Sequence, residues 1–442
     1  MSKRNVILLI IILGIIIIGA FGFLYLYQPA SKTTGTTSVV NFIANFLPFG
    51  KSSSSTPTDT TSPTDVSGYV PSEETTLPNV RLKKVSTFPV AGFGVFMKER
   101  FKDVAEVTPP VTTETKIPTT KPVAPPTEFY PALRYVNRID GNIFQTFADK
   151  IDERKFSSTI IPKVYEAYFG NKGESVVMRY LKEDNKTIET FSGTLQKEYL
   201  GADLAGTGEI TGSFLPENIS DISVSPDTSK VFYLFNIIDN VVGITFTLQS
   251  STKIQVFDSP FTEWLSYWPN NRMITVTTKP SANVPGYMYT INPEKKDFNK
   301  VLGAINGLTT LTSPDGKTIL YGDNNLSLSV LNIETGVTSL LGLKTLPEKC
   351  VWTTTSDTAY CAVPKYSDQI GYPDSWYRGE VSFSDEIWKI DIKNGNTIKI
   401  VNPIEEIGGE EVDAIKLAVD ENQNYLFFVN KKDSYLWELR LK

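Results

Sequence analysis

The 442-residue sequence predicts an all-β fold, a seven-bladed β-propeller, preceded by one transmembrane helix and a disordered linker. Three observations predict this organisation. An uncharged apolar run of 22 residues lies near the N-terminus, a long stretch rich in Ser, Thr and Pro follows it, and a strand-turn-strand pattern repeats along the remaining chain. Short strands separated by evenly spaced turn signals are typical of propellers.

The apolar run, residues 6–27, predicts a signal-anchor helix. At ~1.5 Å per residue it is long enough to cross a hydrocarbon core of ~30 Å. Lys3 and Arg4 precede it, and this favours a cytoplasmic tip at residues 1–5 with the remainder extracytoplasmic. A cleaved signal peptide is the alternative, but its apolar region is usually only about 7–15 residues. We therefore expect a single-pass protein of the cell membrane.

Residues 28–78 predict a flexible linker. Within residues 51–78, 18 of 28 residues are Ser, Thr or Pro, a composition too polar to bury a core. The segment 38–50 has apolar side chains spaced for one side of a short helix, which fits either a lipid-interface segment or an apolar docking peptide. A linker of this length has a root-mean-square reach on the order of 40 Å, so the folded domain would hang clear of the membrane.

Composition excludes several classes of function. A net charge of −6 with 21% charged residues leaves no basic face for nucleic acid. The chain contains no histidine, which rules out Ser-His-Asp triads, Cys-His pairs and His-ligated metals. Two cysteines alone cannot form a thiolate zinc site. We find no catalytic, cofactor-binding or metal-binding signature, and we expect no enzymatic activity.

The two cysteines, Cys350 and Cys361, predict a disulfide. A hairpin with residues 354–357 as its loop places them directly opposite each other, on a non-hydrogen-bonded pair where Cα atoms lie ~4.5–5.5 Å apart. An oxidising exterior would permit the bond. Two buried free thiols in a sheet are the alternative.

The repeat itself spans residues 79–442. In each unit a short strand enters a tight polar turn and continues into a strongly apolar strand; the turns centre near Asn171, Asp227, Asn270, Asp315, Asp357 and Glu421. A second hairpin follows in most units, for example at Thr335-Gly336 or Asn394-Gly395, where Asn and Gly supply the positive φ of tight hairpins. Four strands in ~45 residues correspond to one propeller blade.

The number of blades depends on the two ends of the domain. A seventh unit, residues 91–147, is interrupted by the segment 101–128, in which 13 of 28 residues are Thr or Pro. We interpret this segment as a disordered loop within the unit; a second interdomain linker is the alternative. The last unit is one strand short, and residues 79–85 are well placed to supply it and close the ring. We predict seven blades, with six as the alternative.

Two of the turns carry a family resemblance. Ser313-Pro314-Asp315-Gly316-Lys317 and Ser225-Pro226-Asp227, each followed by apolar residues, resemble the repeat of TolB-like, WD40-like (PD40) propellers. The likeness covers most of residues 79–442, with two close units. The anchor, linker and propeller together resemble uncharacterised membrane-anchored bacterial envelope proteins. The resemblance implies a protein-binding module, and it maps no ligand residues onto this chain.

An insertion at residues 366–388 departs from the repeat and supplies our candidate partner-binding loop. Aromatic and arginine side chains dominate binding hot spots, and binding loops usually sit on rigid scaffolds. The candidate residues are Tyr372, Asp374, Trp376, Tyr377 and Arg378. Asp374 and Arg378 have the i, i+4 spacing of an ion pair. The alternative is that the aromatic residues fold back to cap the blade or plug the channel mouth.

A carboxylate cluster precedes the last blade: Glu405, Glu406, Glu410, Glu411 and Asp413. Its spacing does not match a calcium-binding EF-hand loop, so we expect a solvated acidic connection.

These observations predict a binding or scaffold module of the cell envelope with a protein partner, held to the membrane by its N-terminal helix. The main alternative is a carboxylate-dependent carbohydrate hydrolase or glycan-binding propeller. A hydrolase would need two acidic side chains ~5–10 Å apart in the central channel. A third alternative, an assembly subunit, would need a large exposed apolar patch.

Overall fold

The computed structural model describes residues 81–102, 125–150, 152–200, 208–367, 371–406 and 408–442. The described residues all lie within one compact unit, residues 75–442. Outside them lie the predicted cytoplasmic tip (1–5), transmembrane helix (6–27), linker (28–78) with its amphipathic segment (38–50), and residues 103–124 of the predicted Thr/Pro loop. Among the residues described, none of the helices is long and apolar enough to cross a membrane.

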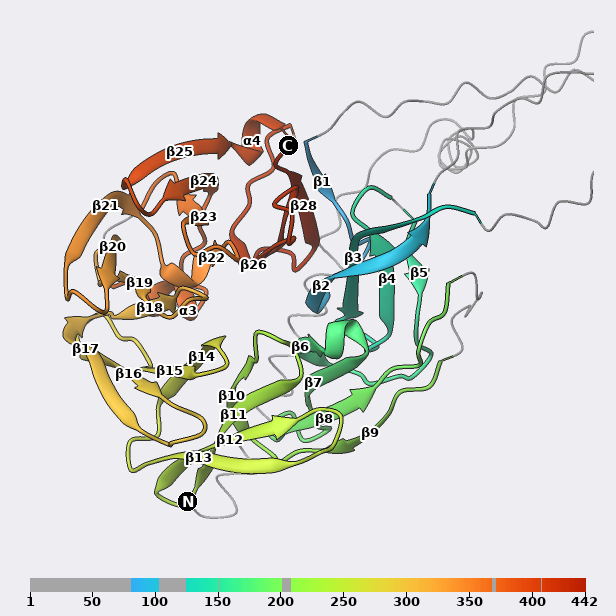
Figure 1. Ribbon diagram of the computed structural model, residues 1–442, viewed down its shortest axis with the longest axis horizontal. Helices are drawn as coiled ribbons and strands as arrows, with labels where there is room; N and C mark the ends of the chain where they lie inside the picture. The colour runs from blue at the N-terminus through green and yellow to red at the C-terminus, as the bar shows by residue number, and fades with distance from the viewer. Residues whose placement is uncertain (1–80, 103–124, 151, 201–207, 368–370, 407) are drawn as a thin grey trace, which may run out of the picture. The chain divides into compact units, whose positions relative to one another are not determined.

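The described residues form seven four-stranded antiparallel sheets, and Figure 1 shows them arranged as blades around a ring in chain order. We number the blades from the first complete sheet. Blade 1 contains β2 (Val90–Phe101), β3 (Thr127–Asn137), β4 (Ile143–Phe147) and β5 (Arg154–Lys155). Blade 2 contains β6 (Val164–Gly170), β7 (Ser175–Leu181), β8 (Ile188–Thr194) and β9 (Thr211–Phe214). Blade 3 contains β10 (Ile219–Val224), β11 (Lys230–Ile237), β12 (Asn240–Thr247) and β13 (Lys253–Ser259).

The remaining blades follow the same plan. Blade 4 contains β14 (Trp264–Asn270), β15 (Met273–Thr278), β16 (Pro285–Ile291) and β17 (Phe298–Asn306). Blade 5 contains β18 (Thr309–Thr312), β19 (Thr318–Gly322), β20 (Ser327–Asn332) and β21 (Thr338–Lys344). Blade 6 contains β22 (Cys350–Trp352), β23 (Thr358–Pro364), β24 (Asp385–Asp391) and β25 (Asn396–Val401). Blade 7 contains β26 (Ala414–Val419), β27 (Tyr425–Asn430), β28 (Leu436–Arg440) and β1 (Leu82–Lys84). The short helices are η1 (Asn171–Gly173), η2 (Pro347–Lys349), α3 (Asp374–Tyr377) and α4 (Pro403–Glu406).

The blades pack face to face, and this explains the apolar second strands of the repeat. In β27 every residue is buried, because both faces of the strand are covered. On one side, Leu426 and Phe428 of β27 pack with Tyr360 and Ala362 of blade 6. Outer strands such as β25 carry mostly exposed or half-buried residues. The predicted turns at the first hairpin of each unit all separate the first and second strands of a blade, which confirms the repeat.

The N-terminal strand closes the ring, as predicted. β1 pairs with β28 and becomes the outermost strand of blade 7; Figure 1 shows the blue strand beside the red one. Lys83 lies opposite Glu438, and their side chains form an ion pair of 3.2 Å. The seven-bladed prediction is therefore correct and the six-bladed alternative is not.

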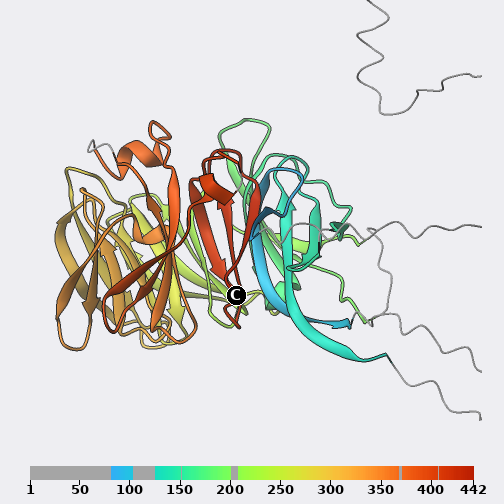
Figure 2. The ribbon, with the colours of Figure 1, turned by 90° about the horizontal axis from the view of Figure 1, so that it is seen from above.

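The blade topology defines two faces of the ring. Four antiparallel strands return the chain to the face where it entered, so every innermost strand begins on the same face, which we call the entry face. The insertion of blade 6 follows a second strand, β23, and therefore lies on this face too. In Figure 2 the orange segment with α3 rises above one face, whereas the extended β2–β3 hairpin projects beyond the other.

Blade 6 carries the two cysteines. Cys350 of β22 lies opposite Cys361 of β23, and a disulfide with an S–S distance of 2.05 Å joins them. The bond connects the innermost strand of the blade to the second strand, directly beneath the insertion.

Candidate functional site

Charged side chains gather where the innermost strands begin. Glu166 of β6, Asp221 of β10 and Lys416 of β26 each sit at a β-bulge, where the pairing with the second strand shifts. A bulge redirects a side chain that regular alternation would point elsewhere, and bulges occur often beside functional sites. Lys416 also has a φ of 53°, an unusual conformation for a residue with a side chain.

Their contacts join the innermost strands of different blades. The Lys416 ammonium lies 3.9 Å from the Glu166 carboxylate and donates a hydrogen bond of 3.0 Å to the carbonyl of Ala91. Blades 7 and 2 are not neighbours, so this contact passes along the inner side of blade 1. Arg179 of β7 donates to Glu166 at 2.5 Å. Asp221 accepts hydrogen bonds from the amide and the hydroxyl of Ser266, at 2.5 and 2.7 Å.

The two carboxylates have different electrostatic environments. Burial acts to raise the pKa of Glu166, but the positive charges of Lys416 and Arg179 outweigh it and hold the pKa below its usual value. Burial raises the pKa of Asp221 to about 6, against the hydrogen bonds from Ser266, and the charge of Glu166 adds to the increase. The centre of the ring thus holds an ionised carboxylate near one that retains its proton in mildly acidic solution.

A pocket opens on the entry face beside these groups. Its volume is about 350 Å³, counting space open to solvent, and it lies between β14, β15 and β18. Hydroxyl groups line it, including Ser266, Thr277 and Thr310, and the last two hydrogen-bond each other at 2.6 Å. Ser266 connects the pocket to Asp221 through its hydroxyl group. The pocket therefore combines hydroxyl groups with apolar side chains such as Leu265 and Leu308, and a carboxylate lies immediately behind one wall.

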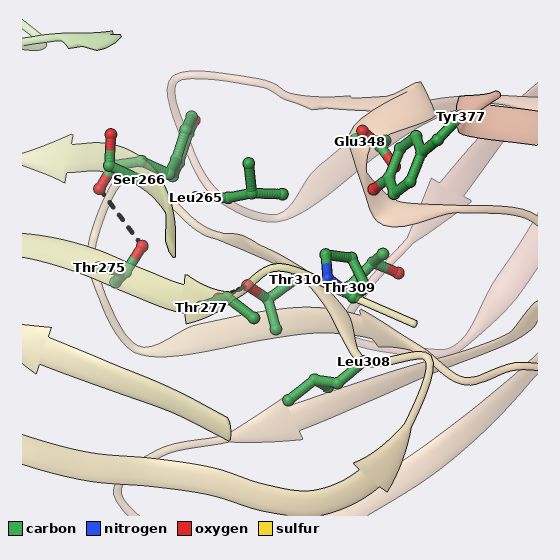
Figure 3. Close-up of a pocket in the computed structure, with 11 residues that line it drawn as sticks. Leu265, Ser266, Thr275, Thr277, Leu308, Thr309, Thr310, Glu348 and Tyr377 are labelled. Atoms are coloured by element: carbon green, nitrogen blue, oxygen red, sulfur yellow. Dashed lines mark hydrogen bonds between the residues drawn. The ribbon is translucent and has the colours of Figure 1, made fainter. Parts of the chain in front are cut away.

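Glu348 and Tyr377 form the opposite side of this pocket, as Figure 3 shows. The Tyr377 hydroxyl donates to Glu348 at 2.5 Å. Solvent reaches Glu348, but the protein surrounding it desolvates the carboxylate and raises its pKa to about 7, although the Tyr377 hydrogen bond acts in the opposite direction. Tyr377 comes from α3, so the insertion completes the pocket that blades 4 and 5 begin.

The structure turns most of the candidate loop inward. Tyr372 is 1% exposed and Trp376 is 4% exposed, and both pack with Phe383 in a small core under the insertion. Tyr377 is half-buried at the pocket, and Arg378 is the one candidate residue that is exposed. The aromatic residues that the sequence offered as contacts are therefore mainly the core of the loop.

The ion pair expected between Asp374 and Arg378 is replaced by two other contacts. Arg378 forms hydrogen bonds of 2.7 and 3.0 Å with Glu380. Asp374 instead accepts a hydrogen bond of 2.5 Å from the backbone amide of Ala282 in blade 4. This contact passes over blade 5 and links the insertion of blade 6 to blade 4. The i, i+4 spacing of Asp374 and Arg378 gives no indication of it.

Buried charges hold the base of the insertion. The Lys349 ammonium contacts Asp413 at 2.5 Å and Asp385 at 2.8 Å, and all three side chains are 0% exposed. Asp413 also accepts a hydrogen bond of 2.9 Å from the indole of Trp376 and one of 3.0 Å from the amide of Phe383. Asp413 thereby joins the insertion to blade 7.

The remaining members of the predicted acidic connection lie apart. Glu405 accepts a hydrogen bond from Asn402, Glu410 pairs with Lys84, and Glu411 pairs with Lys432. Throughout the described part of the chain, no group of three or more Asp, Glu or Cys side chains is arranged to hold a metal ion.

Sequence reasoning missed Glu166, Asp221, Lys416 and the buried Lys349. The bulges that aim the first three toward the centre of the ring change strand alternation, so the sequence pattern could not assign their direction. The sequence carries no signal for Lys349, because its carboxylate partners Asp385 and Asp413 are distant in sequence.

Comparisons with known proteins find similarity in fold only. No family model and no curated protein sequence matches the chain. Similar solved structures include an oligogalacturonate lyase in complex with manganese (TM-score 0.49, 10% identity, 70% of this chain and 86% of that one). TolB from Acinetobacter baumannii is also similar, with a TM-score of 0.37 and 11% identity over 69% of this chain and 60% of that one. A putative 6-phosphogluconolactonase from Bacteroides fragilis has a TM-score of 0.43 and 10% identity over 69% of this chain and 87% of that one.

TolB, whose repeat the sequence resembles, is thus among the similar structures. At these TM-scores and identities, the similarities carry no information about the chemistry of the site.

Proposed function

We propose that the protein is a membrane-anchored, non-catalytic propeller that binds a protein partner of the cell envelope on its entry face. The observation that carries this proposal is the insertion of blade 6, which is fixed to three blades and whose Tyr377, together with Glu348, completes a pocket of mixed polar and apolar lining. A preorganised surface loses little conformational entropy on binding.

The exposed part of the insertion has the composition of a protein-binding surface. Tyr377 and Arg378 are residue types enriched in binding hot spots, and Glu380 adds a charged rim beside them. The buried aromatic residues Tyr372 and Trp376 hold α3 in place, so the side chains above are oriented without a partner. Binding on a rigid loop of a propeller is consistent with the expectation from the TolB-like resemblance.

The central carboxylates are bonded within the protein, and this supports binding over catalysis. Glu166 is held by Arg179 and by Lys416, and Asp221 accepts two hydrogen bonds from Ser266. Each carboxylate thus joins neighbouring elements of the ring.

An extracytoplasmic position fits the remaining features. The apolar run at residues 6–27 is long enough for an anchor, and two basic residues precede it. The disulfide between Cys350 and Cys361 is a bond that persists in oxidising compartments.

Photo-crosslinking of full-length protein in native membranes tests the proposal. A photoreactive amino acid replaces Arg378, whose side chain is 60% exposed on the entry face. The matched control replaces Val337, which is 61% exposed in the β20–β21 turn on the opposite face. We expect a discrete protein adduct from position 378 alone. Equal adducts from both positions, or none from position 378, would refute binding on the entry face.

A carbohydrate hydrolase is the second candidate, and one observation favours it. The environments of Glu166 and Asp221 move their pKa values in opposite directions, an arrangement that assigns an acid and a base in glycosidases. Release of reducing sugar from envelope glycans by the wild type, abolished by Asp221→Asn and by Glu166→Gln, would establish this function. Retention of the fold in both variants, checked by circular dichroism, is the necessary control.

A further inference from the structure

Lys349 lies in a buried site with two carboxyl groups from different elements. It is the last residue of η2, directly before β22, whereas Asp385 opens β24 and Asp413 directly precedes β26. The Lys349 Nζ atom lies 2.8 Å from Asp385 Oδ2 and 2.5 Å from Asp413 Oδ1. None of the three side chains is exposed to solvent. An amine is therefore held against a carboxyl group where water does not compete.

We propose that Lys349 and Asp385 form an intramolecular amide bond, with Asp413 transferring the protons. The Lys349 Nζ atom bonds to the Asp385 Cγ atom, and the bond from Cγ to Oδ1 breaks. Oδ1 leaves as water, and Oδ2 remains as the carbonyl oxygen of the new amide. The reaction is a condensation, so it needs no oxidant, reductant or cofactor.

The hydrogen bonds distinguish the two oxygens of Asp385. Oδ2 accepts a hydrogen bond of 2.7 Å from the amide of Ala414, the kind of donor that an amide carbonyl retains. Oδ1 is buried and has no hydrogen-bond partner within the described part of the chain. An unpartnered buried oxygen is costly in a stable ion-pair cluster, but it is the atom that the condensation removes.

The two carboxyl groups have different roles because their surroundings differ. Burial raises the pKa of Asp385 to about 6, against the charge of Lys349, so Asp385 is the group that can hold a proton and accept a nucleophile. Burial also opposes ionisation of Asp413, but Lys349 and the hydrogen bonds from Phe383 and Trp376 keep its pKa below the usual value. Asp413 is thus the base.

The protons balance in three transfers. The Lys349 ammonium gives a proton to the Asp413 carboxylate, and the neutral amine attacks Cγ of protonated Asp385. Asp413 then returns that proton to Oδ1, which departs as water. The new amide nitrogen gives its surplus proton back to Asp413, which ends protonated. One ammonium and one carboxylate disappear as charges, and one water molecule is released.

The environment favours condensation over the separated ions. The Lys349 Nζ atom lies 5.1 Å from the centre of the Trp376 ring and 5.3 Å from that of Phe383. These aromatic groups exclude water, and charges desolvated in such a site are costly even when paired. Two further charged groups face the site: Lys431, whose ammonium lies over the Trp376 ring, and Glu348, whose carboxylate interacts with both Lys349 and Lys431. Burial lowers the pKa of Lys431 and outweighs the negative charge of Asp413, which favours the charged form of Lys431.

The bond would lock the base of the insertion. It joins the start of the innermost strand of blade 6 to the start of the third strand, and the insertion lies between the two linked residues in sequence. The disulfide at Cys350 lies one residue away. The inference does not rest on the proposed function, because it uses only the buried site.

Peptide mass spectrometry of purified full-length protein tests the bond. After reduction, alkylation and trypsin digestion, an amide at Lys349 blocks cleavage after that residue. We expect peptide 345–365 covalently joined to peptide 379–389, with a mass lower by one water than their sum. Free peptide 345–349 as the main product would overturn the proposal. A link from Lys349 to peptide 400–416 would overturn Asp385 as its acceptor.

Two variants identify the reacting groups. In Asp385→Asn the leaving group is ammonia, so the linked pair should be lighter than the variant's own peptides by one ammonia. In Lys349→Arg the charge remains but the amide cannot form, and we expect no linked pair. Because the wild-type digest decides the presence of the bond, failure of either variant to fold does not rescue the proposal. Loss of water in Lys349→Arg would show a different modification and refute it.

Discussion

Trp376 donates its indole N–H to Asp413 with an Nε1–Oδ2 distance of 2.9 Å, and this contact fastens the insertion of blade 6 to the residue directly before the first strand of blade 7. Both residues are buried. A residue that the sequence suggested as a binding contact is therefore part of the support of the loop, and the exposed Arg378 occupies the surface above it.

The first prediction concerns this contact. Trp376→Phe keeps an aromatic ring but removes a hydrogen-bond donor from a buried carboxylate, which should lower the free energy of unfolding by about 1.5–3 kcal/mol. Urea denaturation followed by circular dichroism measures the change. Trp388→Phe is the matched control, because the Trp388 indole donates at 3.3 Å to Glu386 in a half-buried site. Equal losses in both variants would contradict a special role for Trp376.

The second prediction concerns the disulfide. Cys350 and Cys361 are 11 residues apart, and cross-linking a loop of this size should stabilise the fold by about 2–3 kcal/mol through the unfolded chain. Cys350→Ser combined with Cys361→Ser should lower the thermal unfolding temperature by several degrees, as measured by calorimetry. Adding reductant should lower the wild-type temperature and leave the variant unchanged. An unchanged wild type in reductant would contradict the prediction.

Much of the fold could be predicted because its signals are local. Gly316 and Gly395 have φ values of 75° and 69°, and the turns that need such values are visible in the sequence around them. Ring closure was also predictable, since the last unit lacked a strand and the chain offered one before the first unit. Both inferences use the order of elements along the chain and need no side-chain geometry.

The candidate site could not be predicted to the same degree because it depends on long-range contacts. The direction of Trp376 is set by Asp413, and that of Glu166 by a bulge and by Lys416 from a distant blade. Strand alternation assigns a face only where pairing is regular. The sequence indicated that an unusual loop lies on blade 6, but its aromatic residues lie mainly inside.

The third prediction concerns pH. Burial raises the pKa of Glu438 to about 7, against the charge of Lys83, which lies opposite in the closing strand pair; the charges of Asp149 and Asp420 add to the increase. The folded state therefore binds this proton more tightly than the unfolded state does. Protonation of Glu438 therefore stabilises the folded state. This contribution is complete below the unfolded pKa of about 4.3 and is lost as the pH rises through 7.

Glu438→Gln should remove this dependence. As the pH rises from 5 to 8, the free energy of unfolding of the variant should increase by on the order of 2 kcal/mol relative to that of the wild type, because glutamine stays neutral. Denaturation at several pH values measures the difference. Glu334→Gln serves as the control, since that side chain is 63% exposed. A wild-type stability that rises relative to Glu438→Gln over this range would contradict the assignment.

The fourth prediction concerns ring closure by β1. Deleting residues 1–84 removes the strand that covers β28 and takes away the ion pair between Lys83 and Glu438, so a strand edge and a buried carboxylate lose their partners. Unpaired strand edges promote association between chains. We expect this truncation to form oligomers in size-exclusion chromatography with light scattering and to unfold at a lower temperature. Deleting only residues 1–78 retains β1 and is the matched control, which should remain as stable as the longer chain. If the two truncations behaved alike, β1 would not be needed to close the ring, and blade 7 would be stable with three strands.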